Sequence, residues 1–419
     1  MVQCFMFIIL QPMSIINLSQ RRIKMALAQR AYMRVVSVVS NMNLRNYSAA
    51  KSTVNEGNIK KSVFISQSKD IFTNLALEDW IYRNMDFKNH HILMLWQSNP
   101  CVVIGRHQNP WLEAHLAELS SITEHGVQLA RRNSGGGTVY HDYGNLNLTF
   151  FTPREHYDRK YNLELITRSL FREYGMNVNI SPREDLTIRD YKVSGTASKL
   201  GRLSAYHHCT LLVNANKVDL SLALQKQEVE IITNATKSIR SKIMNLCEEN
   251  PDVTVDNLMT VVGWEYMRTP ALTLTDGGIE LANQQNGFQL VNPTEEWFNG
   301  LTEIRETFES WDWCFGKTPK FNISKSFQVP ASLANCEETS DSLKVTMVVE
   351  NGKVSDVNLY IPPNLAFAGF SGNANVITSV IGQRFSEDAL NSMEALLDEL
   401  MSDKDRFVTE CLKQVMRSV

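Results

Sequence analysis

Apolar residues recur at helical spacing in two stretches of the chain. The segment FTNLALEDWIYRNM (72–85) predicts a helix with an apolar face, and residues 161–176 predict a second one. The second helix has Leu163, Ile166, Leu170, Phe171 and Tyr174 on one face and Gly175 near its end. Residues 110–126 also predict a helix, because Pro110 suits a first helical turn and Gly126 suits a helix end.

Strand patterns lie between these helices. They are LMLWQS (93–98), CVVIGR (101–106), LNLTFF (146–151), LTIRDYKVSG (186–195) and AYHHCTLLVN (205–214). The first two flank an Asn-Pro turn at 99–100, and the alternation in LNLTFF predicts a strand buried on one face only. Strand pairs with helices inserted among them predict an α+β fold and not a regular βαβα winding.

A second unit is expected from Pro293, because VNPTEEWFNG is rich in cap and turn residues. It contains VTMVVENGKVSDVNLYI (345–361), whose Asn351-Gly352 pair predicts a β-hairpin. A helical pattern follows over about 386–417. We therefore expect domains at 62–290 and 293–419.

The N-terminal stretch is free of acidic residues as far as Glu56 and carries several arginines. This composition predicts a mitochondrial transit peptide over residues 1–47, with the mature chain starting near Ser48 in the matrix. Met25 is an alternative start. The apolar run CFMFIIL (4–10) fits a secretory signal poorly, because no basic residue precedes it, and it is too short to span a membrane.

Charge and cysteine content exclude several classes of function. The formal net charge is −3, and six of the 42 basic residues lie in 1–47, so the remaining chain is distinctly acidic and a poor candidate for binding nucleic acid. The seven cysteines are scattered without a C-x-x-C motif, which favours free thiols over a disulfide framework or a zinc site. In a strand, His207 and Cys209 would share a face and His208 would lie on the other, so we expect no metal there.

Common phosphate-binding and hydrolase motifs are absent from the sequence. FGKTPK (315–320) has the end of a P-loop, but Trp311 stands where the first glycine is required. No G-x-G-x-x-G follows a strand, and Ser134 is not within G-x-S-x-G.

The segment RRNSGGGTVYHDYGN (131–145) is a candidate ligand-binding turn. Its glycines let backbone N–H groups approach an anion, Arg132 adds charge, and His141 and Asn145 follow. A loose loop is the alternative. Downstream, Lys192 in YKVSG could serve as a fixed cation facing this turn, or could be a solvated edge lysine.

Five motifs together resemble one known family, the lipoate-protein ligase A family. They are LALEDW (75–80), VVIGRHQNPW (102–111), ARRNSGGGTVYHDYGNLNLTFF (130–151), KVSGTASKLGRLSAYHHCTLL (192–212) and SWDWCFGKTPKF (310–321). The resemblance runs from about residue 62 through the C-terminal part, and GTASKLGR and AYHHCTLL are most similar to the animal mitochondrial members.

This resemblance implies a biotin/lipoate ligase-type catalytic domain, related to class II aminoacyl-tRNA synthetases, with a small α+β accessory domain. It implies transfer of a lipoyl group from lipoyl-AMP or lipoyl-GMP to a lysine on the lipoyl domains of 2-oxoacid dehydrogenase E2 subunits, without a permanently bound cofactor or metal. The family's essential lysine falls on Lys192. Its lipoyl contacts fall on Glu78, Arg132, Gly137, His141 and His208, and its adenylate contacts on Gly135, Gly136, Thr138, Val139, Asn145, Asp185 and Ser194.

One departure from the family bears on the donor. Bacterial members have a longer loop with Arg and Lys after KVSG, whereas here SKLGRLSA offers only Lys199 and Arg202. The resemblance therefore favours a transferase that takes preactivated lipoyl-nucleotide, or an acyl chain from a carrier such as the glycine cleavage H protein. A complete ligase that uses free lipoate, ATP and Mg²⁺ is the alternative. A biotin ligase is disfavoured because the sequence lacks a GRGRxxR-type loop. An alternative outside the enzymes is a non-catalytic scaffold that binds lipoyl domains. We expect a monomer that binds neither nucleic acid nor membranes.

Overall fold

A computed structural model describes residues 59–225, 230–268, 276–334, 342–365, 371–375, 380–386 and 402–418. These residues belong to one compact unit, 56–419. The predicted transit peptide lies outside the described residues.

A six-stranded mixed sheet carries the first part of the chain, in the order β10-β11-β6-β2-β1-β13. Its strands are β1 (Lys60–Ser66), β2 (His90–Trp96), β6 (Asn145–Pro153), β10 (Ser194–Leu200), β11 (Ser204–Leu212) and β13 (Gly287–Val291). β1 is parallel to β2 and β13, and the other neighbours are antiparallel. The predicted α+β fold and the strands expected at 93–98, 146–151 and 205–214 are confirmed.

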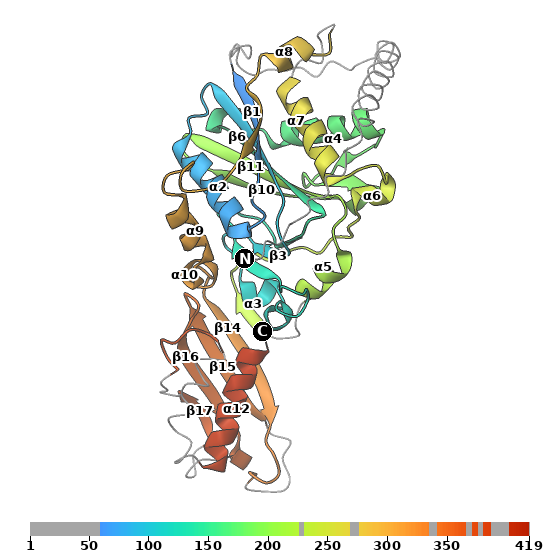
Figure 1. Cartoon of the computed structure of the whole chain (residues 1–419). Helices are drawn as coiled ribbons and strands as arrows, with labels where there is room; N and C mark the ends of the chain where they lie inside the picture. The colour runs from blue at the N-terminus through green and yellow to red at the C-terminus, as the bar shows by residue number, and fades with distance from the viewer. Residues whose placement is uncertain are drawn as a thin grey trace, which may run out of the picture. The chain divides into compact units, whose positions relative to one another are not determined.

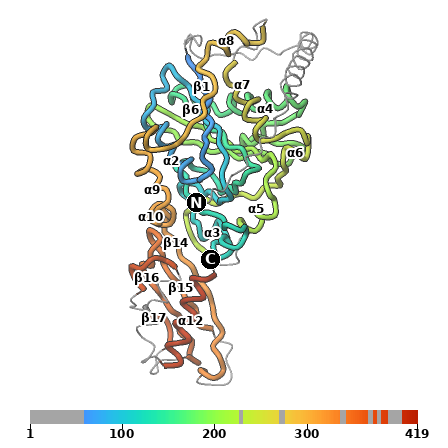
Figure 2. Tube along the Cα trace, in the orientation of Figure 1, coloured from blue at the N-terminus to red at the C-terminus, as the bar shows by residue number. Residues whose placement is uncertain are grey.

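Helices cover both faces of this sheet (Figure 1). α4 (Arg159–Tyr174) and α7 (Val255–Arg268) pack on one face, while α2 (Ile71–Asn84) and α9 (Leu301–Glu309) pack on the other. Figure 2 shows α2 and α9, which are far apart in the sequence, lying side by side. Helices on both faces bury β6 completely, so the prediction that it is buried on one face only is wrong: Asn147 and Thr149 have no exposed surface.

Two helix predictions need correction. Residues 110–126 form only the short α3 (Pro110–Glu113) and a 3₁₀ turn, because the chain becomes extended at Ala114 and the His115 N–H donates to the Ala223 carbonyl. In α4 the predicted apolar face is correct at Leu163, Ile166 and Leu170, but Phe171 lies beyond the buried stripe and is 59% exposed.

The predicted strand at 186–195 is also wrong. It divides into β8 (Leu186–Ile188), β9 (Tyr191–Lys192) and the start of β10. The backbone turns back on itself between β8 and β9, where Arg189 and Asp190 both have positive φ angles of 47° and 69°. That two-residue turn gives the short hairpin that carries Lys192.

A second, five-stranded sheet has the order β12-β14-β15-β16-β17. It contains β12 (Glu230–Thr233), β14 (Phe321–Gln328), β15 (Ser342–Glu350), β16 (Lys353–Ile361) and β17 (Gly372–Asn375), with α12 (Asp403–Arg417) packed on it. The hairpin predicted at Asn351-Gly352 is confirmed, as is a helix in the C-terminal region; 387–401 lies outside the described residues.

The stretch between the two sheets contacts the first one. α9 packs on α2, and α10 (Trp311–Cys314) contacts β4 (Gln128–Arg131). The guanidinium of Arg131, fully buried, donates to the carbonyl oxygens of Cys314 and Gln108. The second sheet itself includes β12, which lies within the predicted catalytic domain, 62–290. The domain limits 62–290 and 293–419 stay predictions.

Candidate active site

The glycine turn and the lysine hairpin line one cavity of about 310 Å³. The predicted residues that the structure brings together there are Arg132, Gly136, Gly137, Thr138, Val139, His141, Asp185, Lys192 and His208. Thus two segments about 50 residues apart in the sequence, the glycine turn and the Lys192 hairpin, line the same cavity.

Backbone geometry explains one glycine of the turn, which joins β4 to β5 (Val139–His141), and the glycine that packs against it. Gly136 has a φ angle of +91°, in the region that favours glycine. A side chain at Gly105, which follows β3 (Cys101–Ile104), would overlap the carbonyl oxygen of Gly136. The turn is therefore an ordered structure against the β3 end and not a loose loop.

Arg132 braces this turn from within. Its guanidinium donates to the carbonyl oxygens of Gly135 (2.6 Å), Gly137 (2.7 Å) and Val103 (3.0 Å). Burial lowers the pKa of Arg132 to about 10, so the group remains charged at neutral pH. It brings a buried positive charge to the cavity, while its N–H groups hold the turn in shape.

Lys192 lies on the opposite wall. Its Nζ is 2.9 Å from Oδ1 of Asp185, and the lysine side chain keeps 27% of its surface exposed. Its backbone N–H donates to the Lys242 carbonyl, and its own carbonyl accepts from the Met244 N–H, which joins β9 to the segment 242–244. The hairpin therefore presents a solvent-accessible, paired cation to the cavity.

Two histidines from different strands face this site. Nδ1 of His208 lies 2.9 Å from Oε2 of Glu78, and Thr149 Oγ1 donates to the same oxygen at 2.7 Å. Burial opposes the ionisation of Glu78, but the charge and hydrogen bond of His208 and the Thr149 hydroxyl outweigh it and lower the Glu78 pKa. Since a carboxylate only accepts hydrogen bonds, Nδ1 of His208 carries a proton.

His141 is the more unusual of the two. It is 1% exposed, and neither ring nitrogen has a hydrogen-bond partner. Burial, followed by the nearby His208 and Arg132, lowers its pKa well below the ordinary value, so the ring is neutral at pH 7. Buried polar atoms usually have hydrogen-bond partners, so the ring nitrogens of His141 are available to a molecule in the cavity.

The alternation predicted for the His-His-Cys segment is confirmed. His207 and Cys209 share one face, with Sγ 3.7 Å from Nε2, and His208 lies on the other. Among the described residues, no group of three or more His, Cys, Asp or Glu side chains is arranged to hold a metal ion. No helix in the same part of the chain is long and apolar enough to cross a bilayer.

Four predicted site residues lie outside the cavity lining. Glu78 holds His208 from behind, and the Ser194 hydroxyl accepts the Leu186 N–H, which joins β10 to β8. Asn145 is buried at the start of β6, where its amide contacts Asn147. Gly135 has open space around its α-carbon.

Sequence reasoning missed two sets of lining residues. Arg159, at the start of α4, and Arg183 add positive charge to the cavity. The segment 236–239 crosses the glycine turn, and the Ser238 hydroxyl accepts the Thr138 N–H at 2.8 Å. A usable signal was present in TKSIRSK (236–242), a basic run in an acidic chain.

The cavity thus joins two environments. Its cationic part has Arg159, Arg183, Lys192 and Lys237 with one carboxylate, Asp185. The uncharged lining residues include Val139, Ala197 and the neutral ring of His141. A mixed sheet that presents a backbone turn, a fixed lysine and a half-cationic, half-neutral cavity defines an enzyme of the acyl-transfer class, suited to a donor with an anionic and an uncharged end.

Comparison with known proteins identifies the family. Residues 70–265 match the lipoyl protein ligase A/B catalytic domain. The human protein "Lipoyl amidotransferase LIPT1, mitochondrial" is 38% identical over 375 residues, which are 87% of this chain and 94% of the human protein. "Lipoate-protein ligase A" of Psychrobacter cryohalolentis is 36% identical over 258 residues, 59% of this chain and 70% of the bacterial one. The chain belongs to the lipoate-protein ligase family.

A solved structure agrees on the fold. It is the crystal structure of P. falciparum LipL1 in complex with lipoate, which superposes with a TM-score of 0.50 at 24% identity. The superposition covers 85% of this chain and 99% of that one. At this identity the likeness supports the biotin/lipoate ligase-type fold alone.

Proposed function

We propose that this protein transfers a lipoyl group from an activated donor, lipoyl-AMP or lipoyl-GMP, to a lysine on the lipoyl domains of 2-oxoacid dehydrogenase E2 subunits. The observation that carries the proposal is the single cavity in which Lys192 and the glycine turn meet, lined by several cationic side chains and by uncharged ones. The human relative, of which the chain covers 94%, is named a lipoyl amidotransferase. The chain is accordingly an acyltransferase that forms an amide on lysine.

The chemistry follows from the groups on the two walls. The neutral amine of the acceptor lysine attacks the acyl carbon, a C–N bond forms, and the C–O bond to the phosphate breaks with the nucleotide leaving. The amine proton goes to a phosphate oxygen or to water. Lys192 stabilises the negative charge that grows on the carbonyl oxygen and the phosphate, a contribution of about 3 kcal/mol for one preorganised donor.

The remaining predicted residues have complementary roles in this proposal. The unpartnered nitrogens of His141 are available to the acyl carbonyl, and His208 is oriented by Glu78. Arg159, Arg183 and Lys237 would bind the phosphate and its nucleotide. Asp185 holds Lys192 in place until the donor arrives.

One structural observation favours transfer over complete ligation. Of the two cations after KVSG, Lys199 is already engaged: its Nζ is 3.1 Å from Asp79 and 4.5 Å from the centre of the Tyr82 ring. Lys199 also lies outside the cavity lining, so it is not placed to hold the phosphates of ATP, which a ligase must bind with Mg²⁺. In the transferase, neither Mg²⁺ nor another cofactor is needed.

We also propose the cellular setting. The word mitochondrial in the human relative's name and the basic leader support a mitochondrial protein, and we place it in the matrix, where the E2 acceptors work. A lipoylated carrier such as the glycine cleavage H protein is a second possible donor, and the enzyme acts as a monomer.

An intact-mass assay tests the proposal. Residues 48–419 are incubated with an apo lipoyl domain and either lipoyl-AMP or lipoate with ATP and Mg²⁺. A lipoyl mass increment with lipoyl-AMP alone supports the transferase. Modification with lipoate and ATP at an equal rate would establish the ligase instead, and no modification with any donor, including lipoylated H protein, would leave only the scaffold.

A further inference from the structure

Asp79 lies next to Glu78 on α2 but points away from the cavity. Its carboxylate is 1% exposed and has three partners from different parts of the chain. Nδ2 of Asn133 donates to Oδ1 at 2.6 Å, and Nζ of Lys199 lies 3.1 Å from the same oxygen. Arg83, one helical turn along α2, forms an ion pair with it.

Asn133 belongs to the base of the glycine turn, between Arg132 and Ser134. Its Oδ1 accepts from Arg106 at 2.8 Å, and the Arg106 guanidinium stacks 4.3 Å from the centre of the Trp313 ring. The Arg106 N–H donates to the Ser134 carbonyl. The base of the turn is thus held by side-chain and backbone polar contacts from α2 and the β3 end.

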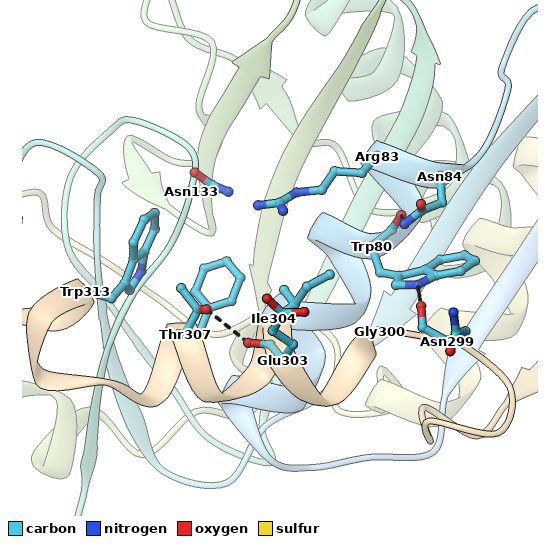
Figure 3. A pocket seen from close by; sticks show the side chains of 11 residues that line it. Trp80, Arg83, Asn84, Asn133, Asn299, Gly300, Glu303, Ile304, Thr307 and Trp313 are labelled. Carbon is cyan, nitrogen blue, oxygen red and sulfur yellow. Dashed lines mark hydrogen bonds between the residues drawn. The ribbon is translucent and has the colours of Figure 1, made fainter.

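Apolar packing does not hold Asn133 on the outer side of the turn. A second cavity of about 310 Å³ lies between α2 and α9, and Asn133 is part of its wall. Figure 3 shows Arg83 reaching from α2 toward Asn133 across this space, with Trp313 on the opposite side. Since the outer side of Asn133 faces a cavity and not a packed core, polar contacts must fix its position.

Lys199 links the same carboxylate to the other wall of the donor cavity. It lies on β10, the strand whose Gly195, Thr196 and Ala197 line that cavity. Asp79 Oδ1 therefore receives one bond from the turn side and one from the β10 side. This buried carboxylate therefore connects the base of the turn to β10.

We propose that Asp79 is a positioning residue for the donor: it touches no substrate, but it clamps Asn133 and β10 and thereby fixes the glycine turn for donor binding. The donor part of this inference rests on the proposed function, whereas the clamp itself does not. Loss of the clamp should weaken donor binding and leave acceptor recognition unchanged.

The variants separate the clamp from general stability. Asn133→Ala removes the turn's side of the contact and keeps the ion pairs of Asp79, while Asp79→Ala removes all of them. The double variant Asp79→Asn/Asn133→Asp exchanges the two groups and restores the hydrogen bond. Arg83→Ala is the matched control, because Arg83 pairs with Oδ2 of Asp79, whereas Asn133 and Lys199 both contact Oδ1.

Two readouts are needed. Hydrogen–deuterium exchange followed by mass spectrometry on the peptide 131–140 requires no donor, and transfer kinetics give KM for lipoyl-AMP and for the lipoyl domain separately. We expect faster exchange and a donor KM raised about tenfold in both alanine variants, as for loss of one charge-assisted hydrogen bond. The acceptor KM should be unchanged, kcat should change less than threefold, and the exchanged pair should restore both readouts.

The outcomes distinguish this inference from the proposed function. If exchange in 131–140 stays as in the wild type, or rises equally in Arg83→Ala, the clamp is refuted whatever the donor is. If exchange rises but the donor KM does not, the positioning role is refuted. If the wild type transfers no lipoyl group while exchange rises only in the clamp variants, the clamp stands and the proposed function fails.

Discussion

Replacing Lys192 gives the sharpest test of the chemistry. Lys192→Ala removes the cation that shares the cavity with the glycine turn, and Lys192→Gln removes the charge but keeps a polar side chain. Nζ lies 2.9 Å from Asp185 in the unliganded protein, so the lysine is already oriented when the donor binds. A preorganised donor of this kind contributes about 3 kcal/mol to the transition state, which corresponds to a roughly 10²-fold lower kcat.

Stability should hardly change in these variants. Both members of the Lys192–Asp185 pair retain exposed surface, 27% and 15%, so their pairing contributes at most about 1 kcal/mol to folding. Lys217→Ala is the matched control, because Lys217 also pairs with a carboxylate. Its Nζ lies 2.9 Å from Oε1 of Glu248, and neither residue lines the cavity. Its kcat should equal that of the wild type.

The assay is intact-mass analysis of an apo lipoyl domain under saturating lipoyl-AMP, with a thermal melt of each variant. Low kcat at an unchanged melting temperature supports the assigned role. More than a tenth of wild-type kcat in both Lys192 variants would refute it, because no other side chain in the cavity has been assigned that charge.

Three further predictions follow from buried groups. Gly105→Ala should raise the donor KM, measured in the same assay, because its methyl group would displace the Gly136 carbonyl. His141→Phe should lower transfer yet raise the melting temperature of the unliganded protein, since it removes a buried ring whose nitrogens lack partners, at a cost of about 1–3 kcal/mol; a lower melting temperature would contradict this reasoning. Burial opposes ionisation of Glu265, but Arg268 and Arg172 hold its pKa below the ordinary value. The ionised Glu265 therefore stabilises the folded protein above the pKa that this group has in the unfolded chain, and this stabilisation is lost as the pH falls through the lower pKa of the folded state. Glu265→Gln should therefore cost about 2–3 kcal/mol in urea unfolding at pH 7, and the difference from wild type should shrink below about pH 4.3.

Local patterns predicted the elements whose burial follows their own sequence. The helix at 72–85 has an apolar face that packs into the core, so its position could be read directly. The strand at 205–214 was also found, although β11 is buried on both faces. The failures came where distant segments decide the environment. Asn147 and Thr149 read as solvent-facing, but β6 lies in the middle of a covered sheet and these polar side chains face the Glu78–His208 pair.

The candidate site shows the same division. Motif resemblance located Lys192 and the glycine turn, and the structure brings them to one cavity. It did not indicate Ser238, because the segment that crosses the turn is placed there by contacts with Gln108 and Glu113. Motif resemblance also could not indicate that the Arg132 guanidinium donates to carbonyl oxygens of the turn itself. These hydrogen bonds depend on the direction of the backbone carbonyls.

The strand β12 has a consequence for how this protein can be divided. It lies at 230–233, within the predicted catalytic domain, yet it pairs with β14 and forms one edge of the second sheet. A C-terminal fragment that starts at Pro293 would lack this edge strand and expose β14 for pairing with other chains. An N-terminal fragment would carry a strand without its sheet. The two fragments should therefore recombine by donor-strand complementation, with residues 230–233 supplied in trans, whereas neither should behave as a self-sufficient module.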